Sequence, residues 1–338
     1  MTIMKKGIIC LIIMAGAVLL VALMMFLPIN KTGGTAYLCI DNDDTIDSVE
    51  VKLSSVSRAY GVGAVKLMAS LTGYADNIRS GRYEIGTGTG ALVLFHHMRN
   101  GQQSPVRLTI PSVRTMDRLA DELSEKLMVS KGELMKTFES NDSCAKYGVD
   151  TATVACLFIP NTYEVYWNTS VEKLMAKMKR ESEAFWTTER TNKAKALGLT
   201  SDEVITIASI VDEETANNAE KPMIAGMYYN RFKQEMSLQA DPTVKFALKD
   251  FEIKRIYTKM LSVDSPYNTY RNKGLPPGPI RIPSVAGIDA VLNLVHHDFL
   301  YMCAKEDLSG THNFARTYQE HLQNAAKYSK ALDERGIK

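Results

Sequence analysis

The stretch LTSDEVITIASIVDEETA, residues 199–216, decides how the chain is interpreted. Thr200 and Glu203 have the spacing of a capping box, so a helix is predicted to begin there. At about 100° per residue, Glu213 falls on a polar stripe of this helix, whereas Glu214 continues an apolar stripe. Glu213 is therefore expected to be a solvated charge. Glu214 is either paired with a cation or partly desolvated, and desolvation would favour the neutral acid that general acid catalysis requires. Asp212 also has apolar neighbours, so helical geometry alone does not exclude it.

Length and composition indicate a multidomain globular protein behind a membrane segment. The chain has 338 residues, 45% of them hydrophobic, and a formal net charge of +2. This composition is sufficient to build a core, and the length predicts more than one domain. A net charge this small gives no support for nucleic-acid binding, which usually shows a concentrated basic face.

The N-terminal run Gly7–Leu27 contains no charged residue and is long enough to span a bilayer as a helix. Lys5 and Lys6 precede it, so the positive-inside tendency places the short N-terminus in the cytoplasm and the rest of the chain outside. A cleaved signal peptide is the alternative. The length of the run and the absence of a small-x-small cleavage pattern favour an uncleaved single-pass anchor, comprising residues 1–29.

A short linker and a small α+β unit are predicted to follow the anchor. Asn30–Ala36 has the composition of a flexible linker. Residues 37–105 then show strands flanking short helices, which indicates a compact α+β module rather than a doubly wound sheet. The expected strands are Tyr37–Ile40 and Gly81–Ile85, and the expected helices are Thr45–Val56, Gly63–Leu71 and Ala91–Met98.

The remainder of the chain, residues 106–338, is predicted to be a mixed α+β domain. The expected strands are Val106–Ile110 and Leu300–Ala304; the expected helices are Met116–Leu127, Ser130–Phe138, Val171–Ala196, the helix that carries Glu214, Pro222–Lys233, Ser284–Val295 and Tyr318–Asp333. The segments between these helices are polar and proline-rich, which is typical of loops that present hydrogen-bonding groups at fixed positions.

Several familiar motifs are excluded. Gly86–Ala91 formally fits a dinucleotide fingerprint, but no acidic residue occurs between Glu84 and Asp117 to bind a ribose. No HExxH, CxxC or aspartate-rich loop occurs in residues 238–280, and no metal and no cofactor are expected. The GxSxG motif of serine hydrolases is absent from the sequence.

Histidine and cysteine side chains are interpreted as structural. His96-His97 and His296-His297 lie near the ends of apolar helical runs, where cations suit the helix dipole. The cysteines match no metal or redox spacing. A Cys144–Cys156 bridge is an open alternative, but buried free thiols are expected.

Two kinds of segment could bind sugar. Leu157–Trp167, LFIPNTYEVYW, combines four aromatic rings with short polar groups, and it could form either a sugar-binding wall or part of the core. Three later loops, Leu238–Val244, Ser265–Tyr270 and Gly274–Ile280, carry hydroxyls, amides and a carboxylate. That inventory suits hydrogen bonding to a sugar better than metal binding.

Six motifs in order carry a resemblance to a known family. They are Ala208–Ala216, Asn230-Arg231, Leu238–Val244, Tyr267–Tyr270, Gly274–Ile280 and His312–Phe314. Together they resemble the endolytic murein transglycosylases of the YceG-like (MltG) family, over most of the chain from Val106 onward. The N-terminal anchor and a small LysM-like module at 37–105 before a catalytic domain at 106–338 also fit the family plan.

The resemblance implies a lyase that cuts peptidoglycan glycan strands between N-acetylmuramic acid and N-acetylglucosamine and leaves 1,6-anhydro ends. It places the catalytic glutamate, acting as general acid and then base, at Glu214. It implies substrate contacts from Asn161, Tyr163, Gln239, Asp241, Thr243, Tyr267, Asn268, Thr269, Tyr270 and His312. It also implies an inner-membrane protein with its catalytic domain on the periplasmic side, acting on peptidoglycan and meeting penicillin-binding protein synthases during wall assembly.

The sequence departs from the family pattern at two positions. Asp212 stands where the family usually has the first glutamate of an E-x-E pattern, and Asn161 stands where members often have aspartate. Two alternatives remain at this point. One is a murein hydrolase with Asp241 as a second carboxylate, and the other is a membrane-tethered peptidoglycan-binding scaffold without activity.

Overall fold

The computed structural model describes residues 2–253 and 255–335. The chain divides into two compact units, and the predicted α+β class is confirmed. The first unit comprises Met1–Leu108, Ser124–Ser130 and Tyr163–Ser170, and the second comprises the remaining segments, including all of Val171–Lys338. The first unit therefore includes residues 106–108 and two further segments from the region expected to form the second domain.

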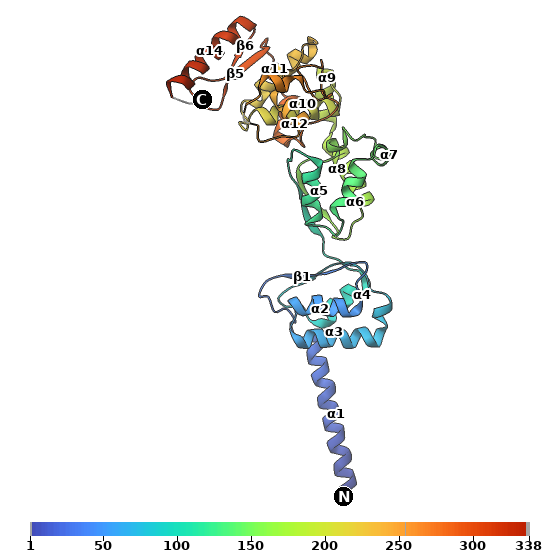
Figure 1. The fold of residues 1–338 in the computed structure, drawn as a ribbon. Coiled ribbons are helices and arrows are strands. Elements are labelled where there is room, and N and C mark those ends of the chain that lie inside the picture. Colours follow the sequence, from blue (N-terminus) through green and yellow to red (C-terminus); the bar gives the residue numbers. More distant parts are fainter. Residues whose placement is uncertain (1, 254, 336–338) are drawn as a thin grey trace. The chain divides into compact units, whose positions relative to one another are not determined.

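Figure 1 shows the elements in chain order. The N-terminal part contains α1 (Thr2–Phe26), β1 (Ala36–Ile40), α2 (Ile46–Val56), α3 (Ala59–Thr72), the 3₁₀ turn η1 (Tyr74–Asp76), β2 (Gly81–Ile85), α4 (Ala91–Asn100) and β3 (Val106–Ile110). Next come α5 (Met116–Ser124), α6 (Lys131–Phe138), α7 (Asn141–Ala145), η2 (Val154–Leu157), β4 (Asn161–Val165), α8 (Val171–Phe185) and α9 (Thr188–Leu197). The last part contains α10 (Ser201–Glu214), α11 (Lys221–Lys233), α12 (Asp241–Leu248), η3 (Thr258–Ser262), α13 (Val285–Leu292), β5 (Tyr301–Ala304), β6 (His312–Ala315) and α14 (Tyr318–Glu334).

The first unit is built on the antiparallel pair β1–β2, in which Leu38 lies opposite Tyr83. Alternate residues of both strands, Leu38, Ile40, Tyr83 and Ile85, are buried in one core with α2, α3 and α4. Since side chains alternate between the two faces of a strand, the helices cover one face of this pair.

The segment after α1 corrects one prediction. Asn30, expected to begin a flexible linker, is buried, and its side chain donates hydrogen bonds to Gly34 O at 2.7 Å and Ile85 O at 2.5 Å. The preceding Ile29 is fully buried in the core of the first unit. The chain at Asn30 is therefore part of this unit, because its hydrogen bonds and apolar packing fix it there.

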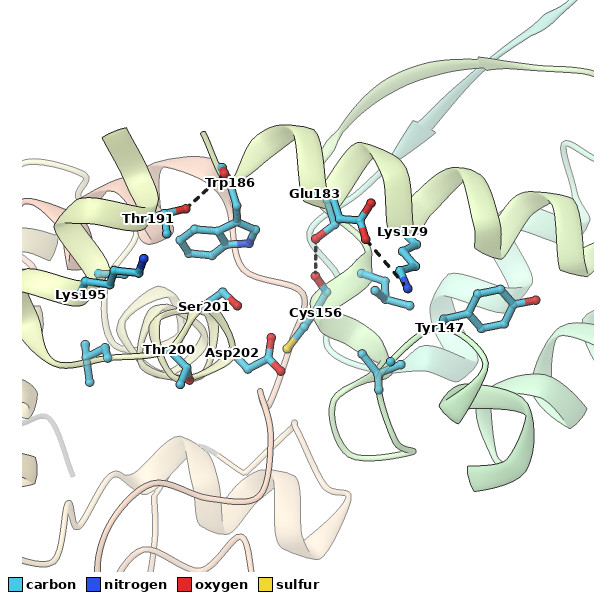
Figure 2. Close-up of a pocket in the computed structure, with 16 residues that line it drawn as sticks. Tyr147, Cys156, Lys179, Glu183, Trp186, Thr191, Lys195, Thr200, Ser201 and Asp202 are labelled. Atoms are coloured by element: carbon cyan, nitrogen blue, oxygen red, sulfur yellow. Dashed lines mark hydrogen bonds and ion pairs between the residues drawn. The ribbon is translucent and has the colours of Figure 1, made fainter. Parts of the chain in front are cut away.

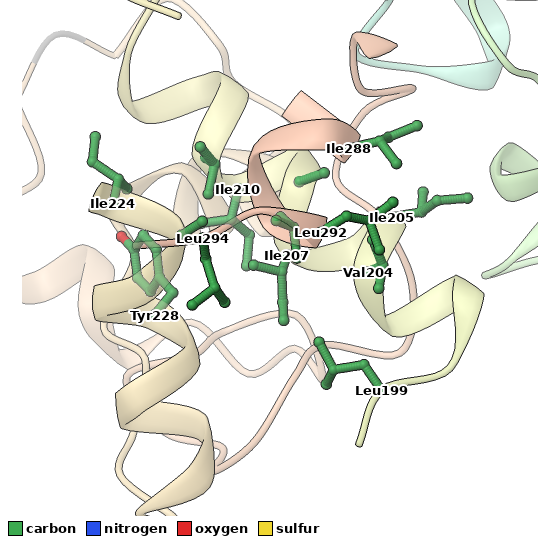
Figure 3. Close-up of a cluster of buried hydrophobic side chains, with 14 of the residues drawn as sticks. Leu199, Val204, Ile205, Ile207, Ile210, Ile224, Tyr228, Ile288, Leu292 and Leu294 are labelled. Atoms are coloured by element: carbon green, nitrogen blue, oxygen red, sulfur yellow. The ribbon is translucent and has the colours of Figure 1, made fainter. Parts of the chain in front are cut away.

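The second unit is organised around α10. All eight residues from Val204 to Val211 are buried, and the helix packs against α9, α11, α12 and α13. Figure 3 shows isoleucine and leucine side chains from α10, α11 and α13 meeting in one cluster, with Tyr228 of α11 at its edge. A helix buried on all sides is held mainly by apolar packing, so the position of its last turn is well defined.

Both ends of α10 are fixed by hydrogen bonds. The predicted capping box at Thr200 and Glu203 is confirmed. Near the other end, Ser209 Oγ accepts a hydrogen bond from Ile280 N at 3.0 Å, which ties the loop Gly274–Ile280 to the helix. In that loop a side chain at Gly278 would lie 2.1 Å from Ala152 O, so only glycine permits the close approach.

Several secondary-structure predictions were wrong. The expected single helix Val171–Ala196 is two helices, because the chain breaks after Phe185 and Thr187 caps a new helix. The expected loop around Asp241 contains α12, which begins at that residue with Pro242 in its first turn. Strands β4 and β6 were not predicted, since four- and five-residue strands carry little periodic signal.

Candidate functional site

The last turn of α10 carries three consecutive carboxyl groups in three different environments. The first, Asp212, forms an ion pair with Lys221 Nζ at 2.7 Å, and both side chains are less than one-tenth exposed. Its other contacts are to Ser284, whose backbone N donates at 2.5 Å and whose Oγ donates at 3.1 Å. Since Ser284 is the N-cap of α13, Asp212 joins α10, α11 and α13. Its role is therefore structural.

Glu213 corrects another expectation. It was expected to be a solvated charge, but its side chain is only 11% exposed and pairs with two arginines. Arg114 Nε lies 2.9 Å and Arg281 Nη1 lies 2.8 Å from Glu213 Oε1. The helical stripe correctly put Glu213 on a polar face, but it could not show that loops from elsewhere in the chain cover that face.

Glu214 has no ion pair among the residues that the structure describes. Tyr228 Oη donates a hydrogen bond to Glu214 Oε1 at 2.5 Å. Burial raises the pKa of Glu214 to about 7, and the nearby Asp241 carboxylate adds to the rise. The hydrogen bond from Tyr228 and the charges of His312 and Lys245 act in the opposite direction. Burial therefore favours the neutral acid form of Glu214.

Glu214 opens onto a cleft of about 300 Å³ in the second unit. The lining combines acidic, basic, amide and aromatic side chains with the strand β5. Its residues are Glu214, Met227, Tyr228, Arg231, Leu238, Gln239, Asp241, Tyr270, Tyr301, Met302, Cys303, Ala304, His312, Tyr318 and His321. The cleft is thus mainly polar with aromatic rings in its wall, and convergent polar groups in a concave site are typical of ligand binding.

Arg231 and Gln239 form one corner of the cleft. Arg231 is buried and donates through Nη1 to Leu238 O at 2.9 Å and to Gln239 Oε1 at 3.4 Å. Burial lowers the pKa of this guanidinium. Gln239 has φ = 49°, a left-handed conformation that is uncommon for a residue other than glycine. Strained backbone of this kind is concentrated at functional sites, where the surrounding structure holds it in place.

Asp241 and Tyr270 form a second polar pair in the cleft. Tyr270 Oη donates to Asp241 Oδ1 at 2.5 Å. Burial, followed by the hydrogen bond and charge of Asp241, raises the pKa of the Tyr270 hydroxyl, so that hydroxyl stays protonated. Both residues were among those expected to contact substrate, and the structure places both beside Glu214.

His312 also lines the cleft, and its orientation is fixed by Glu220. Glu220 Oε1 accepts from His312 N at 2.6 Å, and Glu220 Oε2 lies 3.1 Å from His312 Nδ1. Glu220 is buried at the start of α11. A carboxylate on one ring nitrogen fixes the ring plane and leaves the other nitrogen available to a ligand.

Other residues expected to contact substrate lie behind the cleft. Thr243, Asn268 and Thr269 are at most 1% exposed. Thr243 Oγ1 and Thr269 Oγ1 lie 2.8 Å apart, and Thr269 Oγ1 accepts from Ala240 N at 3.0 Å. These bonds hold the backbone on both sides of Gln239, Asp241 and Tyr270, so the three residues support the cleft rather than line it.

Tyr267, Asn161 and Tyr163 are not among the residues lining the cleft. Tyr267 packs against Phe246, with ring centroids 4.7 Å apart, and lines a different cavity with that residue. Asn161 is exposed on β4, where its side chain accepts from Thr162 N at 2.8 Å. Tyr163, on the same strand, is buried in the first unit.

Sequence reasoning missed Tyr228 and Glu220, and it gave Arg231 no role. Tyr228 lies one helix away from Glu214, and only the packing of α10 on α11 brings the two together. Arg231 was within a quoted motif, but its buried position could not be known from the motif. Glu220 gave no sequence signal, because an acidic residue before a predicted helix is ordinary at a helix start.

A larger cavity of about 650 Å³ lies at the opposite end of α10 (Figure 2). Its labelled lining includes Trp186, Lys195, Cys156 and Asp202. Burial raises the pKa of Asp202, while a hydrogen bond with the buried Cys156 thiol partly offsets the rise. The four cysteines at 39, 144, 156 and 303 are free thiols, so the open alternative of a Cys144–Cys156 bridge is not present.

Metal ligands do not cluster in the described part of the chain. Within residues 2–253 and 255–335, no group of three or more histidine, cysteine, aspartate or glutamate side chains could hold a metal ion.

Comparison with known proteins gives consistent matches. The model of the YceG-like family matches residues 38–327. An endolytic murein transglycosylase of Bacillus subtilis (strain 168) is 27% identical over 277 residues, covering 77% of this chain and 76% of that protein.

A second relative and a solved structure extend the match. An endolytic murein transglycosylase of Streptococcus pneumoniae serotype 2 (strain D39) is 27% identical over 299 residues, and the match covers 77% of this chain but only 52% of that longer protein. A crystal structure of a yceG-like protein from Listeria monocytogenes superposes with a TM-score of 0.56 at 26% identity, covering 86% of this chain and 98% of that one.

Proposed function

The chain belongs to the YceG-like family, and from this premise we propose that it is a peptidoglycan lytic transglycosylase that acts through Glu214. Relatives named endolytic murein transglycosylase support this reaction class. The substrate is the glycan strand of murein, cut between N-acetylmuramic acid and N-acetylglucosamine. The product is a 1,6-anhydro-muramyl end.

The observation that carries the proposal is the contrast within the last turn of α10. Asp212 and Glu213 are each held by cations, which stabilise the charged carboxylate. Glu214 faces a polar cleft, and its pKa is raised to about 7. Near neutral pH this group can both give and take a proton, which one residue must do if it serves as acid and then base.

In the first step, neutral Glu214 protonates the glycosidic oxygen that leaves. Tyr228 Oη donates to Glu214 Oε1, so that oxygen is occupied as an acceptor. The acidic proton is then directed to Oε2, which remains available to the substrate. Positive charge develops at the anomeric carbon, and the substrate's own N-acetyl group or nearby dipoles stabilise it.

In the second step, the 6-hydroxyl of muramic acid attacks the anomeric carbon of the same sugar. Glu214, now a carboxylate, accepts the hydroxyl proton and returns to its starting state. Ordinary glycosidases need two carboxylates because water or an enzyme group must attack. Here the nucleophile belongs to the substrate, and intramolecular attack supplies the advantage of proximity.

Substrate contacts are assigned by position in the cleft. Gln239, Asp241, Tyr270 and His312 line it with Glu214 and are proposed to hydrogen-bond the sugars. The buried residues Thr243, Asn268 and Thr269 are proposed to hold these groups in place. For Tyr267, Asn161 and Tyr163, contact with a longer stretch of strand stays a prediction from the family resemblance.

The membrane placement is also part of the proposal. Gly7–Phe26 of α1 is the one helix in the described residues that is long and apolar enough to cross a membrane. We propose that it is a single-pass anchor with the N-terminus in the cytoplasm, and that the rest of the first unit and all of the second lie outside. Penicillin-binding protein synthases are proposed partners at that surface, and the LysM-like character of the first unit stays an interpretation of its sequence.

One further candidate reaction has a specific observation in its favour. Asp241 lies in the same cleft as Glu214 and influences its pKa. A glycoside hydrolase uses two carboxyl groups in one cleft. Water would then attack the anomeric carbon and leave a reducing muramic acid end. The two reactions differ in their products.

Mass spectrometry of cleavage products tests the proposal. Purified peptidoglycan is treated with the full-length chain in detergent, because truncation near Asn30 would remove the buried Ile29. Anhydro-muramyl ends from wild type and none from Glu214→Gln support a lytic transglycosylase that uses Glu214. Reducing ends would show a hydrolase, and peptidoglycan binding without any new ends would show a scaffold.

A further inference from the structure

The junction between α1 and the first unit is rigid. Backbone hydrogen bonds join Leu27 N to Leu23 O at 3.0 Å and Ile29 N to Thr89 O at 2.9 Å, so the helix passes into the folded unit within two residues. Ile29 is fully buried, and Tyr60 Oη donates to Pro28 O. The anchor therefore does not end in a flexible tether.

The length of the span sets the height of this junction. Gly7–Phe26 contains 20 apolar residues, and at about 1.5 Å per residue these match the roughly 30 Å hydrocarbon core of a bilayer. Phe26 then lies at the boundary of that core. The part of the first unit that packs on residues 24–30 must lie within the headgroup layer.

Like α4, helix α3 contacts α1 where the anchor enters the folded unit. Figure 1 shows α3 lying across the end of α1, between α1 and β1. At about 100° per residue, Tyr60, Leu67 and Leu71 fall on one stripe of α3. Tyr60 bonds the end of α1, so the stripe begins at the anchor and runs away from it along the helix.

The stripe is apolar and open. Leu67 is 38% exposed and Leu71 is 74% exposed, whereas Val65 and Met68 on another face of α3 are buried in the core. Exposed cations flank the stripe: Arg58 is the N-cap of α3, and Lys66 pairs with Glu50 on its side. Leucines beside basic residues are typical of a helix that lies in a membrane interface.

We propose that the stripe Tyr60–Leu67–Leu71 of α3 lies against the lipid headgroup layer and fixes the first unit on the membrane surface. This rests on the proposed anchor and goes beyond it, because the anchor sets the height of the junction but not which face of the unit contacts the lipid. The occupant is lipid rather than a protein partner, since the stripe continues directly from a segment that is itself in the bilayer.

Depth-dependent fluorescence quenching tests the proposal in the full-length chain, reconstituted in vesicles with nitroxide-labelled lipids. Cys10, Cys39 and Cys303 are first replaced by serine, so that a label goes to one introduced cysteine. Leu71→Cys reports the stripe. Glu84→Cys is the control, because Glu84 is exposed on β2 between the buried Tyr83 and Ile85 and so faces away from the helices.

A third labelled variant separates failure of the anchor from failure of the docking. Leu19→Cys lies inside the proposed span. We expect strong quenching at position 19 and at least about threefold more quenching at position 71 than at position 84, because an interfacial helix buries its apolar face about 5–10 Å deep. Quenching at 19 with equal quenching at 71 and 84 would overturn the docking, and absence of quenching at 19 would overturn the anchor.

A pair of matched substitutions shows whether the stripe itself causes the contact. The label is placed at Leu67→Cys, and Leu71→Gln is compared with Val51→Gln. Val51 on α2 is 73% exposed, nearly the same as Leu71. We expect Leu71→Gln to reduce quenching at position 67 and Val51→Gln to leave it unchanged. An equal effect of the two substitutions would contradict a role for the stripe.

Discussion

The two ends of α10 each carry a carboxyl group at a cavity, but the surroundings of the two groups differ. At the N-terminal end Asp202 borders a cavity of about 650 Å³ and is hydrogen-bonded with the Cys156 thiol. At the C-terminal end Glu214 borders a cleft of about 300 Å³ and accepts a hydrogen bond from Tyr228. The larger cavity is not where the family motifs converge. The surroundings of each carboxyl group, rather than the cavity volume, separate the two sites.

Backbone electrostatics deepen the difference. The N-terminal end of a helix favours a negative charge, and the C-terminal end disfavours it. Asp202 lies in the first turn of α10 and Glu214 is its last residue. The helix therefore stabilises charge on Asp202 and opposes charge on Glu214, where the proposed mechanism requires a proton.

The largest expected effect is the loss of activity in Glu214→Gln. Glutamine keeps the shape and the contact with Tyr228 but can neither give nor take a proton. General acid–base catalysis contributes about 10²–10⁴-fold to the rate. We therefore expect anhydro-muramyl ends to be released at least about a thousandfold more slowly, which lies in the upper half of that range. The matched change at the other end, Asp202→Asn, is expected to leave the rate within about twofold. Initial rates on purified peptidoglycan measure both.

Stability against pH shows whether Glu214→Gln remains folded. The folded-state pKa of Glu214 is raised from 4.5 to about 7, so its favourable contribution is complete below 4.5 and is lost as the pH rises through 7. Wild type should therefore lose stability relative to Glu214→Gln between pH 5 and pH 8. Urea midpoints at the two pH values measure this, and a variant less stable than wild type at pH 8 would contradict the burial of Glu214.

The second expectation compares the stability contributed by the ion pairs of the two paired acids, Asp212 and Glu213. Lys221→Ala leaves the Asp212 carboxylate buried without its cation, and breaking such a pair costs about 3–5 kcal/mol of unfolding free energy. Arg114→Ala leaves Glu213 with Arg281 and should cost about 1 kcal/mol or less, since Arg114 is half-exposed. Urea unfolding measures both, and equal losses would show that the two pairs are equally important for stability.

The third expectation concerns the alkaline limb of the pH–rate profile, where activity falls as the pH rises. Wild-type activity should fall as the pH rises through about 7, where Glu214 loses its proton. Tyr228→Phe removes a hydrogen bond that favours the carboxylate, so the pKa of Glu214 and the limb should move to higher pH. A roughly tenfold drop in the rate below the limb is also expected, because the acidic proton is no longer directed to one oxygen.

Tyr229→Phe is the matched control for that limb. The Tyr229 hydroxyl donates to Leu197 O at 2.8 Å, away from the cleft, so its loss should leave the pH profile in place. A limb that stays at the wild-type position in Tyr228→Phe would contradict the direct coupling of Tyr228 to Glu214. A limb that moves in both variants would point to a general change in the packing of α11.

The sequence predicted the parts of this architecture that depend on local pattern. The capping box of α10 and the apolar span of α1 follow from spacing and periodicity, whereas the choice of Glu214 as the catalytic group stays a prediction. Asp241, Tyr270, Gln239 and His312 could be placed beside Glu214 only through the family resemblance, because they come from three segments of the chain that are distant from Glu214 in sequence.

The missed features depend on tertiary contacts. Tyr228 reaches Glu214 only because α11 packs on α10, and Thr243 and Thr269 look like sugar-binding hydroxyls until their mutual hydrogen bond is seen. Asn30 was predicted to begin a linker because its stretch is polar and glycine-rich. In the structure its side chain donates a hydrogen bond to the backbone of β2 at Ile85 O, which fixes it in the first unit. Composition describes what a residue can bond, and only the fold determines what it does bond.

The smallest expected effect tests whether the N-terminal end of α10 is purely structural. Thr200→Ala removes the capping hydroxyl and should cost about 1 kcal/mol of unfolding free energy. Thr317→Ala, in the capping box of the exposed α14, should cost the same or less, because that helix buries no residue fully. Because α10 is rigid and its C-terminal turn is held by α11 and α13, the alkaline limb of Thr200→Ala should coincide with that of wild type. A displaced limb would mean that loosening the first turn reaches Glu214, and the two ends of the helix would then have to be treated as one coupled site.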